Sequence, residues 1–229
     1  DILVMTETPI PRTLALTVYG DLNLSVIDEM PPARQQTETY AVAYDKEKRV
    51  FDFIKKALAR GEQAYIVCPL VEESEKLTLE AAVSLANRLT ATEFKGYKVG
   101  LLHGKLKARE KEALMANFAA GRIQVLVATT VIEVGIDVPN ATIMLVRDAE
   151  RFGLAQLHQL RGRVGRGGAK SYCVLMHNRL NRVAAQRMKA MCKTRDGFEI
   201  AEMDLKLRGP GEFFGIRQHG LPEIKAANR

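Results

Sequence analysis

The chain has few cysteines, three among its 229 residues, at Cys68, Cys173 and Cys192. Because the number is odd and no C-x-x-C pair occurs, the sequence indicates neither a disulfide framework nor a zinc site. It also lacks an apolar run of membrane-spanning length and a visible signal peptide. We therefore expect a cytoplasmic protein with no membrane contact, and we expect Cys68 and Cys173, which lie in apolar runs, to be core residues.

Two signatures of nucleotide chemistry are missing. No G-x-x-x-x-G-K-[ST] loop occurs, so the chain has no Gly-rich turn of that type to hold phosphates with its backbone N–H groups. No DExH-type motif for Mg²⁺ occurs either. We therefore expect that these residues by themselves do not hydrolyse a nucleotide.

Positive charge is concentrated in the last third of the chain. Residues 1–146 contain 17 Lys and Arg against 19 Asp and Glu, whereas residues 147–229 contain 17 against 8. This distribution favours a polyanion, either nucleic acid or phosphate groups, as the partner of the last third. An ordinary basic surface remains the alternative.

From residue 39 onward, short apolar runs alternate with amphipathic segments. The predicted strands are residues 39–43, 64–68, 98–102, 124–128, 142–146 and 172–176, and the predicted helices are 46–59, 75–89, 106–118, 154–160, 180–193 and 198–207. Such alternation predicts an α/β fold with a doubly wound parallel sheet. Ligands of these sheets bind at the carboxyl ends of the strands.

Residues 156–168, QLHQLRGRVGRGG, combine arginine with glycine. Arg161, Arg163 and Arg166 alternate with four glycines, each of which costs roughly 1 kcal/mol in a helix interior relative to alanine. We expect a helix to end here and to present guanidinium groups, which match phosphate oxygens and stabilise charge on a transferring phosphoryl group. A basic surface loop is the alternative.

The pattern Gln159-x-x-Gly162-Arg163-x-Gly165-Arg166 resembles motif VI of superfamily 2 helicases. The resemblance implies that Arg163 and Arg166 are arginine fingers on the γ-phosphate of ATP. It also implies that Gln159 helps to link nucleotide and nucleic acid.

Residues 127–139, VATTVIEVGIDVP, resemble motif V of the same helicases. By this resemblance, the hydroxyl and N–H groups of Thr129 bind a phosphate of the tracked strand. Gly135 and Asp137 approach the nucleotide, with Asp137 near the ribose. A cap of a helix or turn is the alternative role for Asp137.

A third candidate lies between a predicted strand and a predicted helix. Free N–H groups at a helix N-terminus attract phosphate, and Gly104 in the pair His103-Gly104 permits close backbone approach. In similar helicases this stretch contacts the nucleic-acid backbone, and Arg109 matches a family position. A capped helix start without a ligand is the alternative. Residues 68–74, CPLVEES, resemble motif IV.

The two ends of the chain resemble the RecG and Mfd families within superfamily 2. Residues 6–13, TETPIPRT, resemble their motif III, with Glu7 in place of alanine. A helical pair and Gly/Pro-rich loop after residue 177 resemble their translocation motif, with functional positions at Arg187, Arg208 and Gln218. The sequence RGPGE in the loop favours RecG over Mfd. The alternative is a hairpin that only packs on the sheet.

The resemblance implies three parts. Residues 1–37 would be the end of a first motor domain and a linker, residues 38–177 a RecA-like second motor domain, and residues 178–229 the helical hairpin and loop. We accordingly expect a fragment of a longer protein whose preceding part holds the phosphate loop and the Mg²⁺ motif.

The implied function is that of an ATP-dependent DNA helicase or translocase, 3′–5′ in type, that remodels branched DNA in recombination and repair. The expected substrates are stalled forks and Holliday junctions. The expected partners are ATP with Mg²⁺, held mainly by the first motor domain, together with branched duplex DNA and an N-terminal wedge, in a monomer. Two alternatives stay open, an Mfd-like translocase acting on stalled RNA polymerase and a non-enzymatic basic DNA-binding module.

Overall fold

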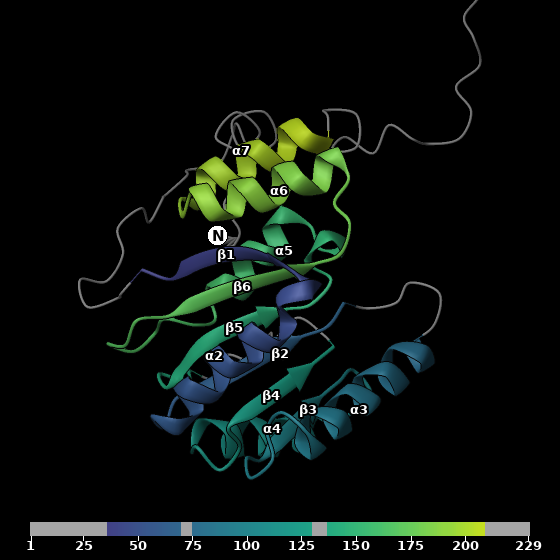
Figure 1. Cartoon of the computed structure of the whole chain (residues 1–229), viewed down its shortest axis with the longest axis vertical. Coiled ribbons are helices and arrows are strands. Elements are labelled where there is room, and N and C mark those ends of the chain that lie inside the picture. The colour runs from purple at the N-terminus through teal and green to yellow at the C-terminus, as the bar shows by residue number, and fades with distance from the viewer. Residues whose placement is uncertain (1–35, 70–74, 130–136, 209–229) are drawn as a thin grey trace, which may run out of the picture.

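A six-stranded sheet forms the centre of the molecule, in the order β1-β6-β5-β2-β4-β3 (Figure 1). The computed structural model describes residues 36–69, 75–129 and 137–208. All the strand pairs in this sheet are parallel, which confirms the predicted α/β sheet. The strands are β1 (Glu38–Ala43), β2 (Gln63–Val67), β3 (Val99–Leu102), β4 (Val125–Ala128), β5 (Ala141–Val146) and β6 (Tyr172–His177).

The helices fall where the apolar periodicity predicted them, with ends that differ by at most two residues. They are α2 (Glu47–Ala59), α3 (Glu75–Ala91), α4 (Ala108–Ala119), α5 (Leu154–Arg161), α6 (Arg182–Lys193) and α7 (Gly197–Arg208), with 3-10 turns η1 (Tyr44–Lys46) and η2 (Ala149–Arg151). No helix in the described ranges is both long and apolar enough to cross a membrane.

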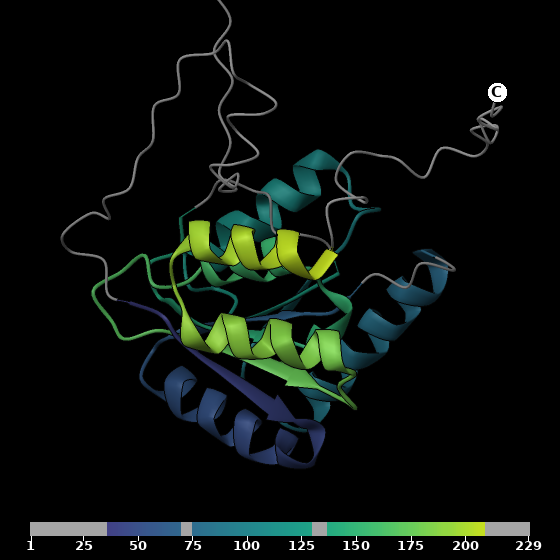
Figure 2. The same cartoon turned by 90° about the horizontal axis from the view of Figure 1, so that it is seen from above.

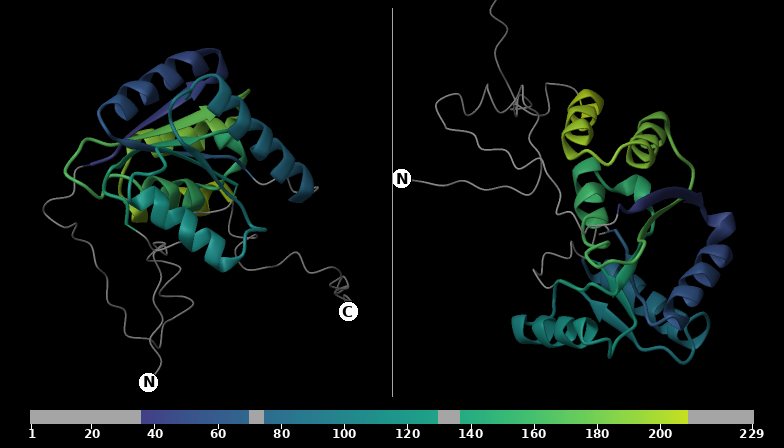
Figure 3. Two further views of the ribbon diagram at one scale, coloured as in Figure 1. Left: turned by 90° about the horizontal axis from the view of Figure 1, so that it is seen from below. Right: turned by 90° about the vertical axis from the view of Figure 1, so that its left-hand side faces the viewer.

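Helices cover both faces of the sheet, as Figure 3 shows for α2 and α4. Side chains alternate between the two faces along each strand. In β2, Ala64 and Ile66 belong to the buried cluster that includes α2 and α3, whereas Tyr65 and Val67 belong to the cluster that includes α4, α5, α6 and α7. This two-sided burial explains why β2, β4 and β5 are buried along their whole length, and it gives the predicted doubly wound arrangement.

Helices α2 and α4 each bury one face. Val50, Phe51, Ile54 and Leu58 of α2 are buried. In α4, Met115 and Phe118 are fully buried, whereas Ala113 is exposed. Residues two apart on a helix point in nearly opposite directions, so a face centred on Met115 turns Ala113 to solvent.

Helices α6 and α7 lie side by side over α5 and β1 (Figures 1 and 2). The side-chain oxygen of Asn181 accepts a hydrogen bond from the N–H of Ala184 at 2.8 Å and caps α6. Ile200 of α7 is buried in the core shared with α5. The predicted helical hairpin is therefore present.

Several predictions lie outside the described residues. They concern the motif III resemblance within residues 1–35, most of the motif IV resemblance at residues 70–74, and the loop after residue 208. Among the cysteines, Cys173 is buried as expected, and Cys68 is partly buried against the core beside α2. Burial raises the pKa of the Cys68 thiol to about 11 and that of Cys173 to about 12.

Candidate functional site

The predicted site residues fall into two groups. In a parallel sheet, all carboxyl ends of the strands meet at the same edge, and His103 and Thr129 follow β3 and β4 there. Asp137 lies in the connection that leads back to the start of β5, and the loop that carries Arg163 and Arg166 leads from α5 back to the start of β6.

The segment after α5, residues 162–167, is here named the arginine loop. Gly165 has a φ angle of 77°, in the left-handed region that favours glycine. Val164, one residue earlier, is completely buried and anchors the loop in the core. Arg163 is half-buried and Arg166 is exposed. The backbone is thus fixed from inside the protein while the guanidinium groups remain near solvent.

Asp137 and Arg166 lie together, although they belong to different sequence motifs. Arg166 Nε is 3.7 Å from Asp137 Oδ1, and their side chains are 32% and 54% exposed. Arg166 Nε also donates a hydrogen bond of 3.3 Å to the carbonyl of Gly162. An ion pair this exposed is weak, so an incoming phosphate can compete with Asp137 for the guanidinium.

Tyr65, in the middle of β2, belongs to the same buried cluster as Val164, so the arginine loop lies on that face of the sheet. Burial raises the pKa of the Tyr65 hydroxyl to about 12, and the nearby positive charges of Arg166 and Arg163 act in the opposite direction.

Arg161 has a different environment from the other two arginines, which the sequence did not predict. It is 5% exposed and points inward, donating from Nη1 to the carbonyls of Met191 at 3.0 Å and Thr194 at 2.8 Å. Its Nη2 donates to the carbonyl of Arg195 at 3.3 Å and lies 3.0 Å from Nδ1 of His158. The expectation that helix α5 presents all three guanidinium groups is therefore wrong for Arg161, which instead satisfies carbonyls at the end of α6.

Arg187 of α6 makes a contact from α6 back to the chain just before α5. Its Nη1 donates to the carbonyl of Phe152 at 2.6 Å, two residues before α5 begins. Its Nε is buried and has no hydrogen-bond partner within the part of the chain that the structure describes. Arg161 and Arg187 thus cross-link α5 and α6 at opposite ends. The side chain of Arg208, together with Gly135 and Gln218, lies outside the described residues.

The first candidate contact with nucleic acid, the His103-Gly104 pair, lies further from helix α4 than predicted. Helix α4 begins at Ala108, four residues after Gly104, because Leu106 N–H bonds back to the His103 carbonyl at 3.3 Å and forms a turn. The expectation that the His103-Gly104 pair lies at the helix N-terminus is therefore wrong. Nδ1 of His103 is buried and unpaired among the described residues, and Arg109 is exposed in the first turn of α4.

Thr129 also differs from expectation in one detail. Its N–H donates to the Leu102 carbonyl at 3.1 Å as a continuation of the sheet, so it is not available to a phosphate. Only its hydroxyl stays a candidate, on a residue that is 4% exposed.

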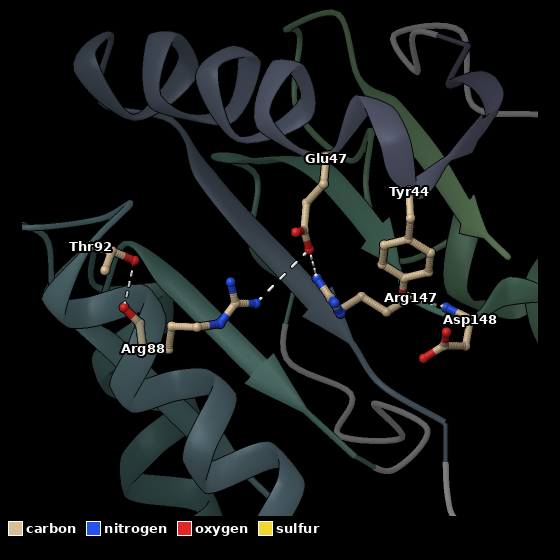
Figure 4. A network of polar contacts seen from close by, with 6 residues as sticks. All are labelled: Tyr44, Glu47, Arg88, Thr92, Arg147 and Asp148. Carbon is tan, nitrogen blue, oxygen red and sulfur yellow. Dashed lines mark hydrogen bonds and ion pairs between the residues drawn. The ribbon is translucent and has the colours of Figure 1, made fainter.

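A polar network at the carboxyl ends of β1 and β5 was not predicted from the sequence (Figure 4). Arg147 Nη1 donates to Glu47 Oε1 at 2.5 Å, and its guanidinium lies 5.0 Å from the centre of the Tyr44 ring. The Tyr44 hydroxyl accepts a hydrogen bond from Asp148 N at 3.2 Å. Asp148 has a φ angle of 46°, which non-glycine residues rarely adopt. An arginine directly after a buried strand was the available signal.

Comparison with known proteins agrees with this arrangement. Residues 45–168 match the family described as "Helicase conserved C-terminal domain", and the chain belongs to that family. Its architecture is thus that of a RecA-like helicase motor domain. Residues 194–228 match a second description, "ATP-dependent DNA helicase RecG, domain 3, C-terminal".

The whole chain is similar to RecG proteins, which confirms the predicted resemblance. The chain is 55% identical to ATP-dependent DNA helicase RecG of Bacillus subtilis, with 100% of the chain and 33% of the relative covered. It is 53% identical to RecG of Thermotoga maritima, again with 100% of the chain and 29% of the relative covered. The chain spans about a third of the length of these relatives.

Solved structures give the same result. A structure of RecG bound to a three-way DNA junction superposes with a TM-score of 0.78 at 50% identity, covering 93% of this chain and 27% of that one. Domain 2 of the DEAD-box helicase Mss116p superposes with a TM-score of 0.54 at 18% identity, covering 70% of this chain and 62% of that one. The second likeness concerns the fold alone.

Proposed function

We propose that this chain is the second motor half of a RecG-type ATP-dependent DNA helicase that remodels branched DNA. The observation that carries the proposal is that Arg166 and Asp137, which belong to two different helicase motifs, lie 3.7 Å apart. Its substrates would be stalled forks and Holliday junctions, and the RecG relative solved on a three-way DNA junction supports a branched substrate.

The arginine loop fits a polyphosphate. Arg163 and Arg166 would contact the γ-phosphate of ATP, while Asp137 and Gly135 would face the ribose side of the nucleotide. Gln159, half-buried on α5, would link this site to nucleic acid. ATP with Mg²⁺ would be held mainly by a first motor domain, since this chain contains no phosphate loop. The guanidinium groups here would stabilise negative charge that develops during phosphoryl transfer.

The contacts between α5 and α6 suggest how nucleotide turnover reaches DNA. Arg161 and Arg187 join the helix that leads into the arginine loop to the helical hairpin. A change in the position of the arginine loop on hydrolysis would therefore move the hairpin with it, as in hinge-type domain closure. Arg187, Arg208 and Gln218 would transmit that movement to duplex DNA.

One DNA strand would run along the neighbouring strand ends. The hydroxyl of Thr129, the turn at His103 and Gly104, and the exposed Arg109 would contact its backbone. Such contacts fix the position of the protein on DNA and carry no base information.

The complete protein would act as a cytoplasmic monomer, together with a first motor domain and an N-terminal wedge. The alternative of an Mfd-like translocase is not favoured, because several relatives that match the entire chain at 50–55% identity are RecG proteins. A non-enzymatic DNA-binding module is not favoured either, because residues 45–168 match the helicase C-terminal domain family.

The decisive variant is Arg166→Ala in the full-length protein. We expect ATP turnover to fall at least about 100-fold, as for loss of other transition-state arginines, while junction binding changes little. DNA-stimulated phosphate release and gel-shift titration with a three-way junction measure the two properties.

Arg122→Ala is the matched control, because Arg122 is also exposed and its guanidinium donates to Oδ1 of Asn117 at 2.6 Å rather than pairing with Asp137. Its ATP turnover should equal that of the unmodified protein. Normal turnover in the Arg166→Ala protein would remove the assignment of Arg166 to the nucleotide.

A further inference from the structure

A second contact joins the arginine loop to the segment between β4 and β5. A Cβ atom placed on Gly167 would lie 2.6 Å from the carbonyl oxygen of Pro139 and 3.3 Å from two further atoms of that residue. Real Cβ atoms do not approach an oxygen this closely, so any side chain at position 167 would force the two backbones apart. The next residue, Gly168, has open space around the same position.

The two contacts are arranged in register. Arg166 is paired with Asp137. The following residue, Gly167, lies close to Pro139, which is two residues after Asp137 in the facing segment. The first contact is an exposed ion pair, which solvent and salt weaken. The second is a close backbone approach that depends on the absence of a side chain at position 167. It is independent of charge, so salt does not weaken it.

We infer that Gly167 is a positioning residue for Arg166, because it sets the distance between the arginine loop and the segment that carries Asp137. This inference rests on the proposed function of Arg166. On the other side of Arg166, the buried Val164 and the left-handed Gly165 hold the loop in the core. Because Gly167 has no side chain, the loop on the other side of Arg166 can lie directly against Pro139, while the exposed Arg166 side chain can exchange Asp137 for a phosphate.

The consequence for catalysis is a geometric one. A guanidinium group that stabilises developing charge must be in place before the reaction, and a displacement of about 1 Å can reduce the rate about 100-fold. An added methyl group at position 167 displaces the arginine loop outward from Pro139. It leaves the charge and length of Arg166 unchanged, so any loss of activity reports position alone.

The test compares Gly167→Ala with Gly168→Ala in the full-length protein. We expect Gly167→Ala to lower kcat of the DNA-stimulated ATPase at least about tenfold with KM for ATP within about twofold, since the first motor domain provides most of the nucleotide binding. Gly168→Ala should leave both constants unchanged. Melting temperatures measured in parallel identify any loss of folding.

A compensating variant separates position from stability. Pro139→Gly removes the ring that holds the facing backbone, so in the double variant Gly167→Ala with Pro139→Gly the carbonyl can rotate away from the new methyl group. We expect partial recovery of kcat in the double variant. No recovery, or a normal kcat in a folded Gly167→Ala protein, overturns the inference. If Gly167→Ala is normal while Arg166→Ala is inactive, only the inference fails and the proposed function stands.

Discussion

At the scale of single residues, three arginines within six positions have three different environments. Arg161 is buried and bonded to carbonyl oxygens, Arg163 is half-buried, and Arg166 is exposed beside Asp137. Their sequence neighbours are similar, so residue type does not distinguish them. Their direction from the end of α5 does, because the helix ends at Arg161 and the chain turns outward at Gly162 and Gly165.

The main effect of Arg161→Ala should therefore be a lower free energy of unfolding rather than a direct loss of phosphate binding. The substitution leaves the carbonyls of Met191, Thr194 and Arg195 without their buried donor. Loss of a buried charged donor of this kind costs about 2–4 kcal/mol. Urea denaturation of the chain, followed by circular dichroism, measures the change in the free energy of unfolding.

Arg166→Ala provides the comparison, with an expected change below about 1 kcal/mol for an exposed pair. Equal stability of the Arg161→Ala and Arg166→Ala proteins would contradict the structural role of Arg161.

At the scale of elements, the turn between α6 and α7 is connected in two directions. The carbonyl of Arg195 accepts a hydrogen bond from Arg161 at 3.3 Å. The Arg195 side chain donates from Nε to the Thr37 carbonyl at 3.2 Å and from Nη1 to the Gln36 side chain. The hairpin turn thus joins the end of α5 to the chain that leads into β1.

Arg195→Ala should loosen the start of β1 without unfolding the sheet. Glu38 N–H is bonded to the Ser171 carbonyl at 2.9 Å, directly after the two residues that Arg195 holds. We expect amide hydrogen exchange at the start of β1 to accelerate, at most about tenfold, because the lost contacts are exposed. Mass spectrometry of the exchanged chain measures this at peptide level.

Lys189→Ala removes an exposed cation from the middle of α6 and should leave exchange in β1 unchanged. If β1 exchanges at the same rate in both variants, Arg195 does not hold that segment.

At the scale of the whole molecule, the described residues form one half of a proposed catalytic site. The arginine loop and Asp137 lie together, and the sequence has no phosphate loop. We expect the isolated chain to show no DNA-stimulated ATP hydrolysis above background. Phosphate release measured with and without a three-way junction tests this expectation.

The full-length protein is the control for that measurement, and it should hydrolyse ATP under the same conditions. Turnover by the isolated chain that is lost in its Arg166→Ala variant would contradict the division of the site between two motor domains.

Local patterns were sufficient for the elements. Apolar alternation and helical periodicity fix which backbone conformation buries each side chain, so strands and helices were predicted to within two residues. The parallel sheet followed from the alternation of short strands with helices. Motif resemblance alone pointed to Arg166 and Asp137, but only the fold placed them 3.7 Å apart.

The sequence by itself determined the fold class, the helicase resemblance and the position of the arginine loop in the chain, because these depend on residue order and periodicity. Tertiary structure alone decided that Arg161 turns inward, that the Thr129 N–H bonds to the Leu102 carbonyl and that Gly167 lies close to Pro139. The physical reason is that these contacts join segments distant in sequence, so the partner of each group is set by packing rather than by its neighbours in the chain.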